Sequence, residues 1–145
     1  MAVGDKIFLD TDVALDHLAD RQPFAEYAHR LFALAEIGEL TLCLSALSFS
    51  NLYYILRKLE GHSKALDLLG KLKQLVRVSA VGEAETQSAL TKSFKDFEDA
   101  IQHFTAKAEG GVSAIITRNK ADYAGSEFPV LSPDEFLAMR EPSAD

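Results

Sequence analysis

The stretch KIFLDTDV (Lys6–Val13) decides how this chain folds. It joins a short apolar run to two carboxylates, Asp10 and Asp12. A continuous apolar run is typical of a strand buried on both faces of a parallel sheet. Open parallel sheets bind their ligands just beyond the carboxyl ends of the strands. We therefore interpret Asp10 as the start of a functional site at a sheet edge.

The rest of the chain alternates between strand and helix patterns. Apolar runs predict further strands at residues 40–44, 76–81, 114–117 and 128–131. Helical spacing of apolar residues predicts helices at residues 13–18, 24–37, 49–59, 63–75, 83–90, 96–108 and from 133 onward. Alternating strands and helices build a parallel sheet covered on both faces. The predicted fold class is α/β, a three-layer sandwich with a central, mostly parallel sheet of about five strands.

Three polar residues are expected to cap helices. Asp12 is the predicted N-cap of the first helix, and Ser63 that of the helix at 63–75. Ser132 is the predicted N-cap of the last helix, where Pro133 and Glu135 complete a capping box.

The length and composition predict a single domain. A chain of 145 residues is long enough for one core, and we place the domain at 1–140 and a frayed tail at 141–145. The one cysteine, Cys43, is expected to be a core thiol and allows no internal disulfide, so a cytoplasmic location is predicted. No signal peptide and no membrane-spanning stretch is evident.

The net charge of −7 argues against broad electrostatic capture of nucleic acid. It does not exclude a nuclease, because bound divalent cations would cancel part of the local negative charge. Basic residues nevertheless gather between Arg57 and Arg77. They form either a solvated helical face or a ridge that contacts phosphates.

Polar side chains form three clusters at the ends of predicted elements. The clusters are Asp10 and Asp12 after the first strand, Asp96, Glu98 and Asp99 in a first helical turn, and Asn119 and Asp122 after the fourth strand. If they converge, the carboxylates raise each other's pKa unless a cation lies between them. Oxygen ligands without histidine or cysteine favour Mg²⁺ or Mn²⁺. Such a cation lowers the pKa of water and neutralises a phosphate oxygen, as phosphodiester hydrolysis requires.

Some of these residues have simpler explanations. Glu98 in a first helical turn also suits the helix dipole, and for Asp12 capping competes with metal binding. Asp10 follows an apolar run directly and needs a cation or hydrogen-bond donors, while Asp99 lies among apolar residues and is expected to point partly inward. His103, one turn after Asp99, is expected on the helix surface rather than at the site.

Taken together, these segments resemble the PIN-domain family, the fold of many VapC-type toxin ribonucleases. The matching stretches are FLDTDVALD at 8–16, SALSFSNLYYIL at 45–56, KDFEDA at 95–100, IITRNKADY at 115–123 and PVLSPDEF at 129–136. The resemblance runs from about residue 6 to 137. It implies a PIN-like fold and a Mg²⁺- or Mn²⁺-dependent ribonuclease that hydrolyses RNA.

The resemblance also implies the roles of individual residues. Asp10 and Asp99 correspond to metal ligands, and the catalytic set comprises Asp10, Asn51, Asp96, Asp99, Asn119 and Asp122. Asn51 stands where the family usually has a glutamate, and an amide offers a neutral oxygen and cannot act as a base. We interpret this as a variant site rather than a dead one. Flanking phosphates are expected to meet Arg57, Lys58, Arg118 or Lys120.

A toxin of this type would have an antitoxin laid across its acidic site, and PIN domains of this size commonly form homodimers. The hairpin from Phe49 to Leu75 is a candidate surface. One alternative is a weak or inactive PIN-like module that binds RNA or protein, which Asn51 favours. Another is a haloacid-dehalogenase-like phosphatase with Asp10 phosphorylated and Asp12 as acid and base, but Asn119 and Asp122 match that pattern poorly.

Overall fold

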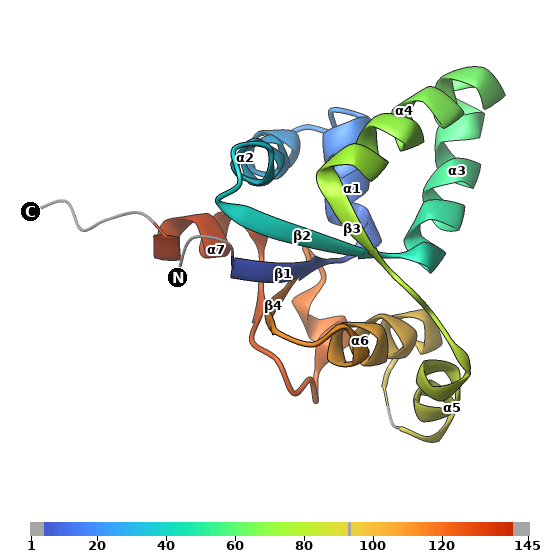
Figure 1. The fold of residues 1–145 in the computed structure, drawn as a ribbon, viewed down its shortest axis with the longest axis vertical. Helices are drawn as coiled ribbons and strands as arrows, with labels where there is room; N and C mark the ends of the chain where they lie inside the picture. The colour runs from blue at the N-terminus through green and yellow to red at the C-terminus, as the bar shows by residue number, and fades with distance from the viewer. Residues whose placement is uncertain (1–4, 93, 141–145) are drawn as a thin grey trace, which may run out of the picture.

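Five parallel strands form the central sheet of the computed structural model, which describes residues 5–92 and 94–140. The strands are β1 (Asp5–Leu9), β2 (Leu40–Ser45), β3 (Val76–Ser79), β4 (Val112–Ile116) and β5 (Val130–Leu131). Their order is β3-β2-β1-β4-β5, and every neighbouring pair is parallel (Figure 1). The predicted five-stranded sheet is confirmed.

Helices cover both faces of this sheet, as predicted (Figure 1). One layer contains α1 (Thr11–Leu18), α2 (Ala25–Glu36), α3 (Ala46–Glu60), α4 (His62–Leu75) and α7 (Pro133–Arg140). The other contains α5 (Glu83–Thr91), α6 (Phe97–Glu109) and the short 3-10 helix η1 (Lys120–Tyr123). The three-layer α/β sandwich of the PIN-like fold is therefore confirmed.

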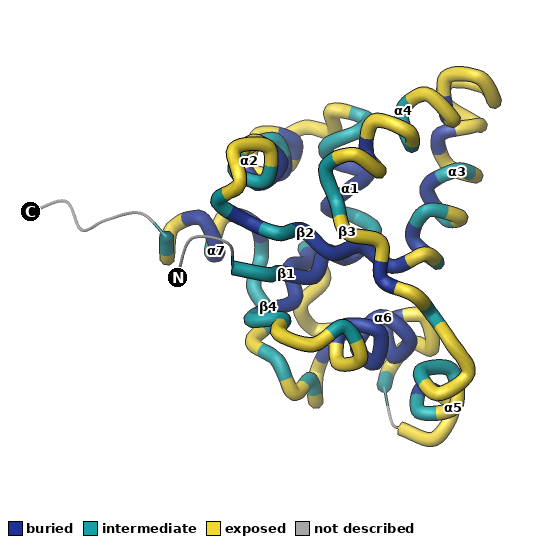
Figure 2. Tube along the Cα trace, in the orientation of Figure 1, coloured by how far each residue is buried: buried dark blue, intermediate teal, exposed yellow. Residues whose placement is uncertain are grey.

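The side chains of β1 alternate between the two layers, as the period of a strand requires. Ile7 and Leu9 pack in the core beneath α1 to α4, while Phe8 packs on the opposite face with Ile115 and Tyr123. All three of these β1 side chains are fully buried, as are most residues of the neighbouring strand β2, whereas β3 is largely exposed (Figure 2). The apolar run thus serves two cores at once.

Cys43 lies in the second of these cores, fully buried beside Phe8. Burial raises the pKa of its thiol to about 11, so the thiol stays protonated and unreactive. The expectation of a core thiol is confirmed.

Two predicted caps were wrong. The first helix begins at Thr11, and its N-cap is Asp10 rather than Asp12: Asp10 is extended, and its side chain accepts a hydrogen bond from the Thr11 amide at 2.8 Å. The apolar periodicity begins only at Val13, which concealed the earlier start. Helix α4 begins at His62 after Gly61, so Ser63 lies inside the helix and does not cap it.

Other boundaries moved by a few residues. Helix α3 begins at Ala46 rather than Phe49, because the Ser45 side chain accepts from the Ser48 amide at 3.0 Å. Strands β3 and β5 are shorter than predicted. The capping box of the last helix is confirmed, with the Ser132 amide donating to Glu135 at 2.9 Å and the Glu135 amide donating to Ser132 at 3.4 Å.

The predicted tail at 141–145 lies outside the described residues. The single domain at 1–140 therefore stays a prediction. No helix among the described residues is both long and apolar enough to cross a bilayer.

Candidate active site

The three acidic clusters line one cavity at the carboxyl edge of the sheet. The cavity measures about 430 Å³ and lies beyond the ends of β1 and β4, where the strand order changes direction. Its acidic and amide lining residues are Asp10, Asp12, Asp96, Glu98, Asp99, Asn119 and Asp122. Residues more than a hundred positions apart in sequence thus meet in one place.

Asp10 is held rigidly at the end of β1. Its Oδ1 accepts from the Thr11 amide at 2.8 Å, and its Oδ2 accepts from the Thr117 hydroxyl at 2.8 Å. Its own amide donates to the Ile116 carbonyl at 2.9 Å, which continues the pairing of β1 with β4. The side chain is therefore fixed from both strands.

Asp99 enters the cavity from the first turn of α6. Asp96 is the N-cap of that helix, and its Oδ1 accepts from the Asp99 amide at 3.1 Å. Gln102, one turn further, donates to the hydroxyls of Ser48 at 2.9 Å and Thr11 at 3.3 Å. This buried network fixes α6, and with it Asp99, against α1 and α3.

The electrostatics of the cavity favour proton or cation uptake. Burial first, and then the negative charges of Asp10, Asp96, Asp122 and Glu98, raise the pKa of Asp99 to about 7. Burial likewise raises the pKa of Asp10, even though hydrogen bonds from Thr117 and Thr11 counteract it. Both carboxylates are less than a tenth exposed. Buried carboxylates this close need a positive charge to stay ionised at neutral pH.

Asp12 positions the segment that follows β4. Its Oδ2 accepts from the Asn119 side chain at 3.0 Å and from the Arg118 amide at 3.2 Å. Its Oδ1 is buried and accepts no hydrogen bond from the described residues. Burial, reinforced by the charge of Asp10, raises the pKa of Asp12 to about 7.

The Arg118 guanidinium forms one wall of the cavity. It donates to the buried Asp16 carboxylate at 2.6 and 3.2 Å and lies over the Phe24 ring, 3.9 Å from its centroid. Arg21 also lines the cavity and approaches Asp16 at 3.6 Å. Two arginines thus border the carboxylates, and guanidinium groups are well suited to bind phosphate oxygens.

The remaining predicted residues lie elsewhere. Asn51 does not line the cavity but donates to Glu98, which does, at 2.6 Å. Lys120 pairs with both Glu135 oxygens at 2.9 Å. Arg57 and Lys58 are exposed in the last turn of α3, away from the cavity lining.

The sequence interpretation overlooked Thr117, Arg21 and Tyr123. Thr117 could have been found, because it follows β4 directly and therefore lies beside Asp10 after β1. Tyr123 is buried near the carboxylates, and its pKa is raised by burial and by the charge of Asp10. Arg21 lies in the connection between α1 and α2, where no periodic pattern places it.

The expectation for His103 was wrong. His103 is only 1% exposed and packs among the rings of Phe94, Phe104 and Phe128. Its Nε2 accepts from the Glu127 amide at 3.1 Å, and burial lowers its pKa, so it is neutral. His103 is a core histidine because α6 is covered on most of its circumference.

The donor set fits a hydrated hard cation. Among the described residues, no three histidine, cysteine, aspartate or glutamate side chains are close enough to enclose a metal ion. Mg²⁺ keeps several waters and typically binds through one or two carboxylates. Asp10 and Asp99, which both line the cavity, supply two such carboxylates.

A parallel sheet of the order β3-β2-β1-β4-β5, with carboxylates beyond the ends of β1 and β4, defines a recognised class of α/β domain. The family model described as "PIN domain" matches residues 6–121, and the chain belongs to that family. The curated protein "Ribonuclease VapC1" of Aquifex aeolicus is 27% identical over 138 residues, covering 92% of this chain and 94% of that one.

Solved structures share the fold at low identity. A toxin–antitoxin complex from Klebsiella pneumoniae superposes with a TM-score of 0.66 at 18% identity, covering 88% of this chain and 97% of the other. VapC20 of Mycobacterium tuberculosis is described as a sarcin-ricin loop cleaving toxin. It superposes with a TM-score of 0.63 at 20% sequence identity, covering 83% of this chain and 95% of VapC20. A chain of VapBC2 from Rickettsia felis, bound to a promoter DNA fragment, superposes with a TM-score of 0.64 at 15% sequence identity. The match covers 88% of this chain and 97% of the other.

Proposed function

We propose that this chain is a Mg²⁺- or Mn²⁺-dependent endoribonuclease and the toxin of a toxin–antitoxin pair. The observation that carries the proposal is the convergence of Asp10, Asp99 and Asp122 on one cavity, with the pKa of Asp10 and Asp99 raised by burial. The relative named as a ribonuclease, alignable over nearly the whole of both chains, supports the activity. The structural neighbours described as toxins and toxin–antitoxin complexes support the biological role.

Asp10 and Asp99 would hold the cation, directly or through water. When bound, the cation lowers the pKa of water and neutralises a phosphate oxygen. Thr117 and the Thr11 amide keep Asp10 pointing into the cavity. Asp96 and Asp122 add negative potential and orient water, and Arg21 and Arg118 hold the phosphates that flank the cleaved bond.

Asn119 and Asn51 serve different purposes in this proposal. Asn119 is oriented by Asp12, and its carboxamide is placed to contact water or a phosphate oxygen. Asn51 holds Glu98 at the cavity wall through the hydrogen bond of 2.6 Å. Asn51 thereby keeps the Glu98 carboxylate at the cavity, whereas the family usually has a glutamate at the position of Asn51 itself.

The test is RNA cleavage by the purified chain with Mn²⁺ and a structured RNA. Asp10→Ala and Asp99→Ala should each lower the rate about 100-fold or more, because each removes a cation ligand. Asp67→Ala is the matched control, since Asp67 is an exposed carboxylate on α4 whose one ion pair within residues 5–92 and 94–140 is with Lys71. Equal cleavage by the unmodified chain and all three variants would refute the assignment of Asp10 and Asp99 as cation ligands.

The second candidate is a PIN-like module that binds RNA or protein without cleaving it, and the amide at Asn51 is the feature that favours it. Calorimetric titration with Mn²⁺ separates the two. Binding that is lost in Asp99→Ala supports the nuclease, while an absence of heat at millimolar Mn²⁺ supports the module.

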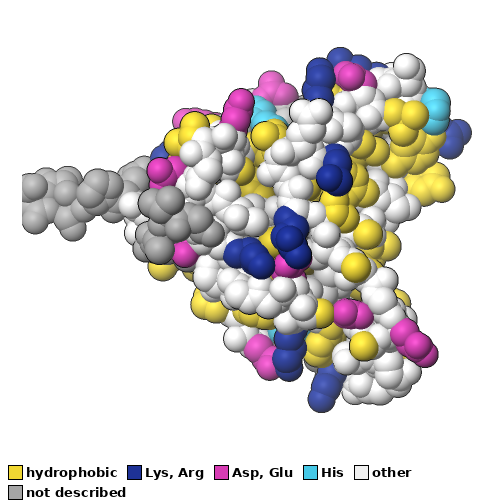
Figure 3. All heavy atoms as spheres, in the orientation of Figure 1, with side chains coloured by type: hydrophobic (Ala, Val, Ile, Leu, Met, Phe, Trp, Pro, Cys, Tyr) yellow, Lys and Arg dark blue, Asp and Glu magenta, His cyan; other side chains and the backbone are white. Residues whose placement is uncertain are grey.

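The proposal includes an antitoxin across the acidic cavity, self-association and a cytoplasmic location. The hairpin of α3 and α4 exposes Tyr54, Leu59 and Leu66, each more than half exposed, and is the proposed contact surface. Hydrophobic side chains gather over this hairpin in Figure 3. A toxin-type role predicts an adjacent gene for a small DNA-binding protein that co-purifies with this chain.

A further inference from the structure

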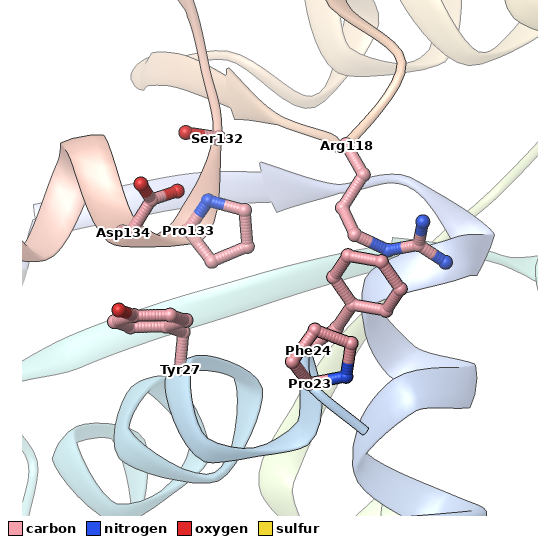
Figure 4. Close-up of a pocket in the computed structure, with 7 residues that line it drawn as sticks. All are labelled: Pro23, Phe24, Tyr27, Arg118, Ser132, Pro133 and Asp134. Carbon is pink, nitrogen blue, oxygen red and sulfur yellow. The ribbon is translucent and has the colours of Figure 1, made fainter. Parts of the chain in front are cut away.

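A second cavity, larger than the acidic one, lies beside it. It measures about 640 Å³ and is enclosed by the start of α2 (Pro23, Phe24 and Tyr27), by Arg118, and by the segment 132–134 at the start of α7 (Figure 4). This volume lies within the range of pockets that bind small molecules or single nucleotides. None of the residues predicted from the sequence as catalytic lines it.

Arg118 is the wall shared by the two cavities. Its bonds to Asp16 and its position over the Phe24 ring hold the guanidinium in place. A ligand that reaches from the carboxylates past Arg118 therefore enters the second cavity directly. A strand with a phosphate at the first cavity would place a neighbouring nucleotide there.

The walls of the second cavity are aromatic with one acidic side. Phe24 and Tyr27 are each 38% exposed, and both line this cavity, so part of each ring is open to a ligand. Asp134 is exposed in the first turn of α7, and it faces the Tyr27 side of the cavity in Figure 4. Aromatic rings stack on bases of any sequence, and a carboxylate accepts hydrogen bonds from the amino group of a base.

We propose that this cavity binds an unpaired nucleobase bearing an exocyclic amino group, next to the phosphate held at the acidic cavity. The base stacks on Tyr27, and its amino group donates to Asp134, while the Arg118 guanidinium already covers one face of Phe24. Asp134 disfavours a phosphate on the Tyr27 side of the cavity, away from Arg118, so the base rather than the backbone enters there (Figure 4). The inference rests on the proposed RNA substrate and adds the subsite that selects it.

The probe is a short single-stranded RNA with one 2-aminopurine, whose fluorescence falls when it stacks on an aromatic ring. Binding is measured with Mg²⁺ in an Asp99→Asn background, so that the strand is not cleaved. Adding Tyr27→Ala should weaken binding about tenfold and abolish the fluorescence change. Adding Tyr27→Phe should preserve both, since the ring remains.

Leu90→Ala is the control, because Leu90 is an exposed apolar side chain on α5 that lines neither cavity. It should leave affinity and fluorescence unchanged. A second arm adds Asp134→Ala, which removes every side-chain acceptor where an asparagine would keep one, and compares, by competition, RNAs that carry 2-aminopurine or unsubstituted purine. The preference for the amino base should disappear in that variant.

Equal affinity and equal fluorescence change for Tyr27→Ala and Leu90→Ala would overturn the inference. If the unmodified chain cleaves RNA in the same trial, the nuclease assignment survives that outcome. Conversely, Tyr27-dependent base binding without any cleavage would retain the base site and remove the nuclease. Unchanged RNA binding together with weakened antitoxin binding in Tyr27→Ala would assign the cavity to a protein partner instead.

Discussion

Thr117 joins the ends of the two central strands through one hydroxyl. That hydroxyl donates to Asp10 at 2.8 Å and accepts from the Asn119 amide at 3.0 Å. It is fully buried, so no water can replace it without rearrangement. A single threonine thus sets the positions of residues from two of the three acidic clusters.

Thr117→Val should lower both activity and stability, because it leaves the buried Asp10 carboxylate short of a donor. We expect a loss of about 1–3 kcal/mol in the free energy of unfolding and a slower cleavage rate. Denaturant unfolding and RNA cleavage measure the two effects.

Thr105→Val is the control for this substitution. Thr105 is equally buried on α6, but its hydroxyl has no hydrogen-bond partner among the described residues. The same change there should be neutral or slightly stabilising. Similar losses at both positions would show that Thr117 acts through packing alone.

Asp99 makes the metal-free protein sensitive to pH. Its pKa in the folded chain is about 7, raised by burial and neighbouring carboxylates from an ordinary value of 3.8. Between pH 3.8 and about pH 7, Asp99 is protonated in the folded chain and ionised in the unfolded chain. The stability that the folded chain gains from holding this proton is fully present below about pH 4 and is lost as the pH rises through 7.

Asp99→Asn should therefore stabilise the metal-free chain at about pH 8 by roughly 1–3 kcal/mol, with a smaller effect near pH 5. Unfolding in EDTA at both pH values provides the measurement. Asp67→Asn on exposed α4 should show no such pH-dependent difference. A stability gain that is the same at both pH values would contradict the assigned cause.

Glu109 ties three secondary-structure elements together at the end of α6. Its carboxylate, 4% exposed, accepts from Ser79 at 2.7 Å, Arg77 at 2.8 Å and Lys6 at 3.2 Å. Burial alone would raise its pKa, but these hydrogen bonds outweigh burial and lower it. The contacts join β1, β3 and α6 on the side of the sheet opposite α1 to α4.

Glu109→Gln should cost about 1–3 kcal/mol of unfolding free energy at neutral pH, since it removes a charge that three donors share. Because the pKa of Glu109 is lowered, the difference from the unmodified chain should shrink as the pH falls below the ordinary range of a glutamate. Glu127→Gln, which breaks an exposed pair with Lys107, should leave stability unchanged. A difference that persists in acid would contradict this account.

The elements themselves were largely predictable, and their ends were not. The apolar runs of β1 and β4 and the spacing along α2 and α6 depend on burial, which sequence records directly. Where a helix begins depends on which side chain reaches a backbone amide, and Asp10 and Ser45 did so earlier than the apolar pattern suggested. The resemblance to the PIN family supplied roles that periodicity alone does not give.

The site was predictable where residues lie at the start or just beyond the end of an element. Asp10 and Asn119 lie beyond the ends of β1 and β4, Asp96 and Asp99 lie at the start of α6, Asp122 lies in η1, and all five line the cavity. Arg21 belongs to a connecting segment. Asn51 is linked to the cavity only through its hydrogen bond to Glu98, which its position in α3 does not reveal. Such side-chain pairings across the fold leave no periodic trace in the sequence.

The whole molecule carries a net charge of −7, and acidic and basic side chains are interspersed on the face in Figure 3. Electrostatics therefore oppose the approach of RNA, and the acidic cavity opposes it most strongly. A cation at the cavity would reverse the local sign of the potential.

RNA binding should consequently increase when Mg²⁺ replaces Na⁺ at constant ionic strength. Fluorescence anisotropy with a labelled RNA and the Asp99→Asn chain, compared with Asp10→Asn/Asp99→Asn, measures the effect without cleavage. The double variant should lose most of the remaining Mg²⁺ stimulation. Equal stimulation in both would place the cation effect on the RNA instead.

The cavity draws its carboxylates from near both ends of the polypeptide, since Asp10 follows β1 and Asp122 lies in η1. A nascent chain on a translating ribosome therefore carries the first half of its site long before the second half exists. A fragment that ends anywhere before β4 lacks Asn119 and Asp122 and therefore cannot complete the cavity. Two fragments divided between α4 and α6 should each hold an incomplete site, and their reassembly would restore the whole cavity.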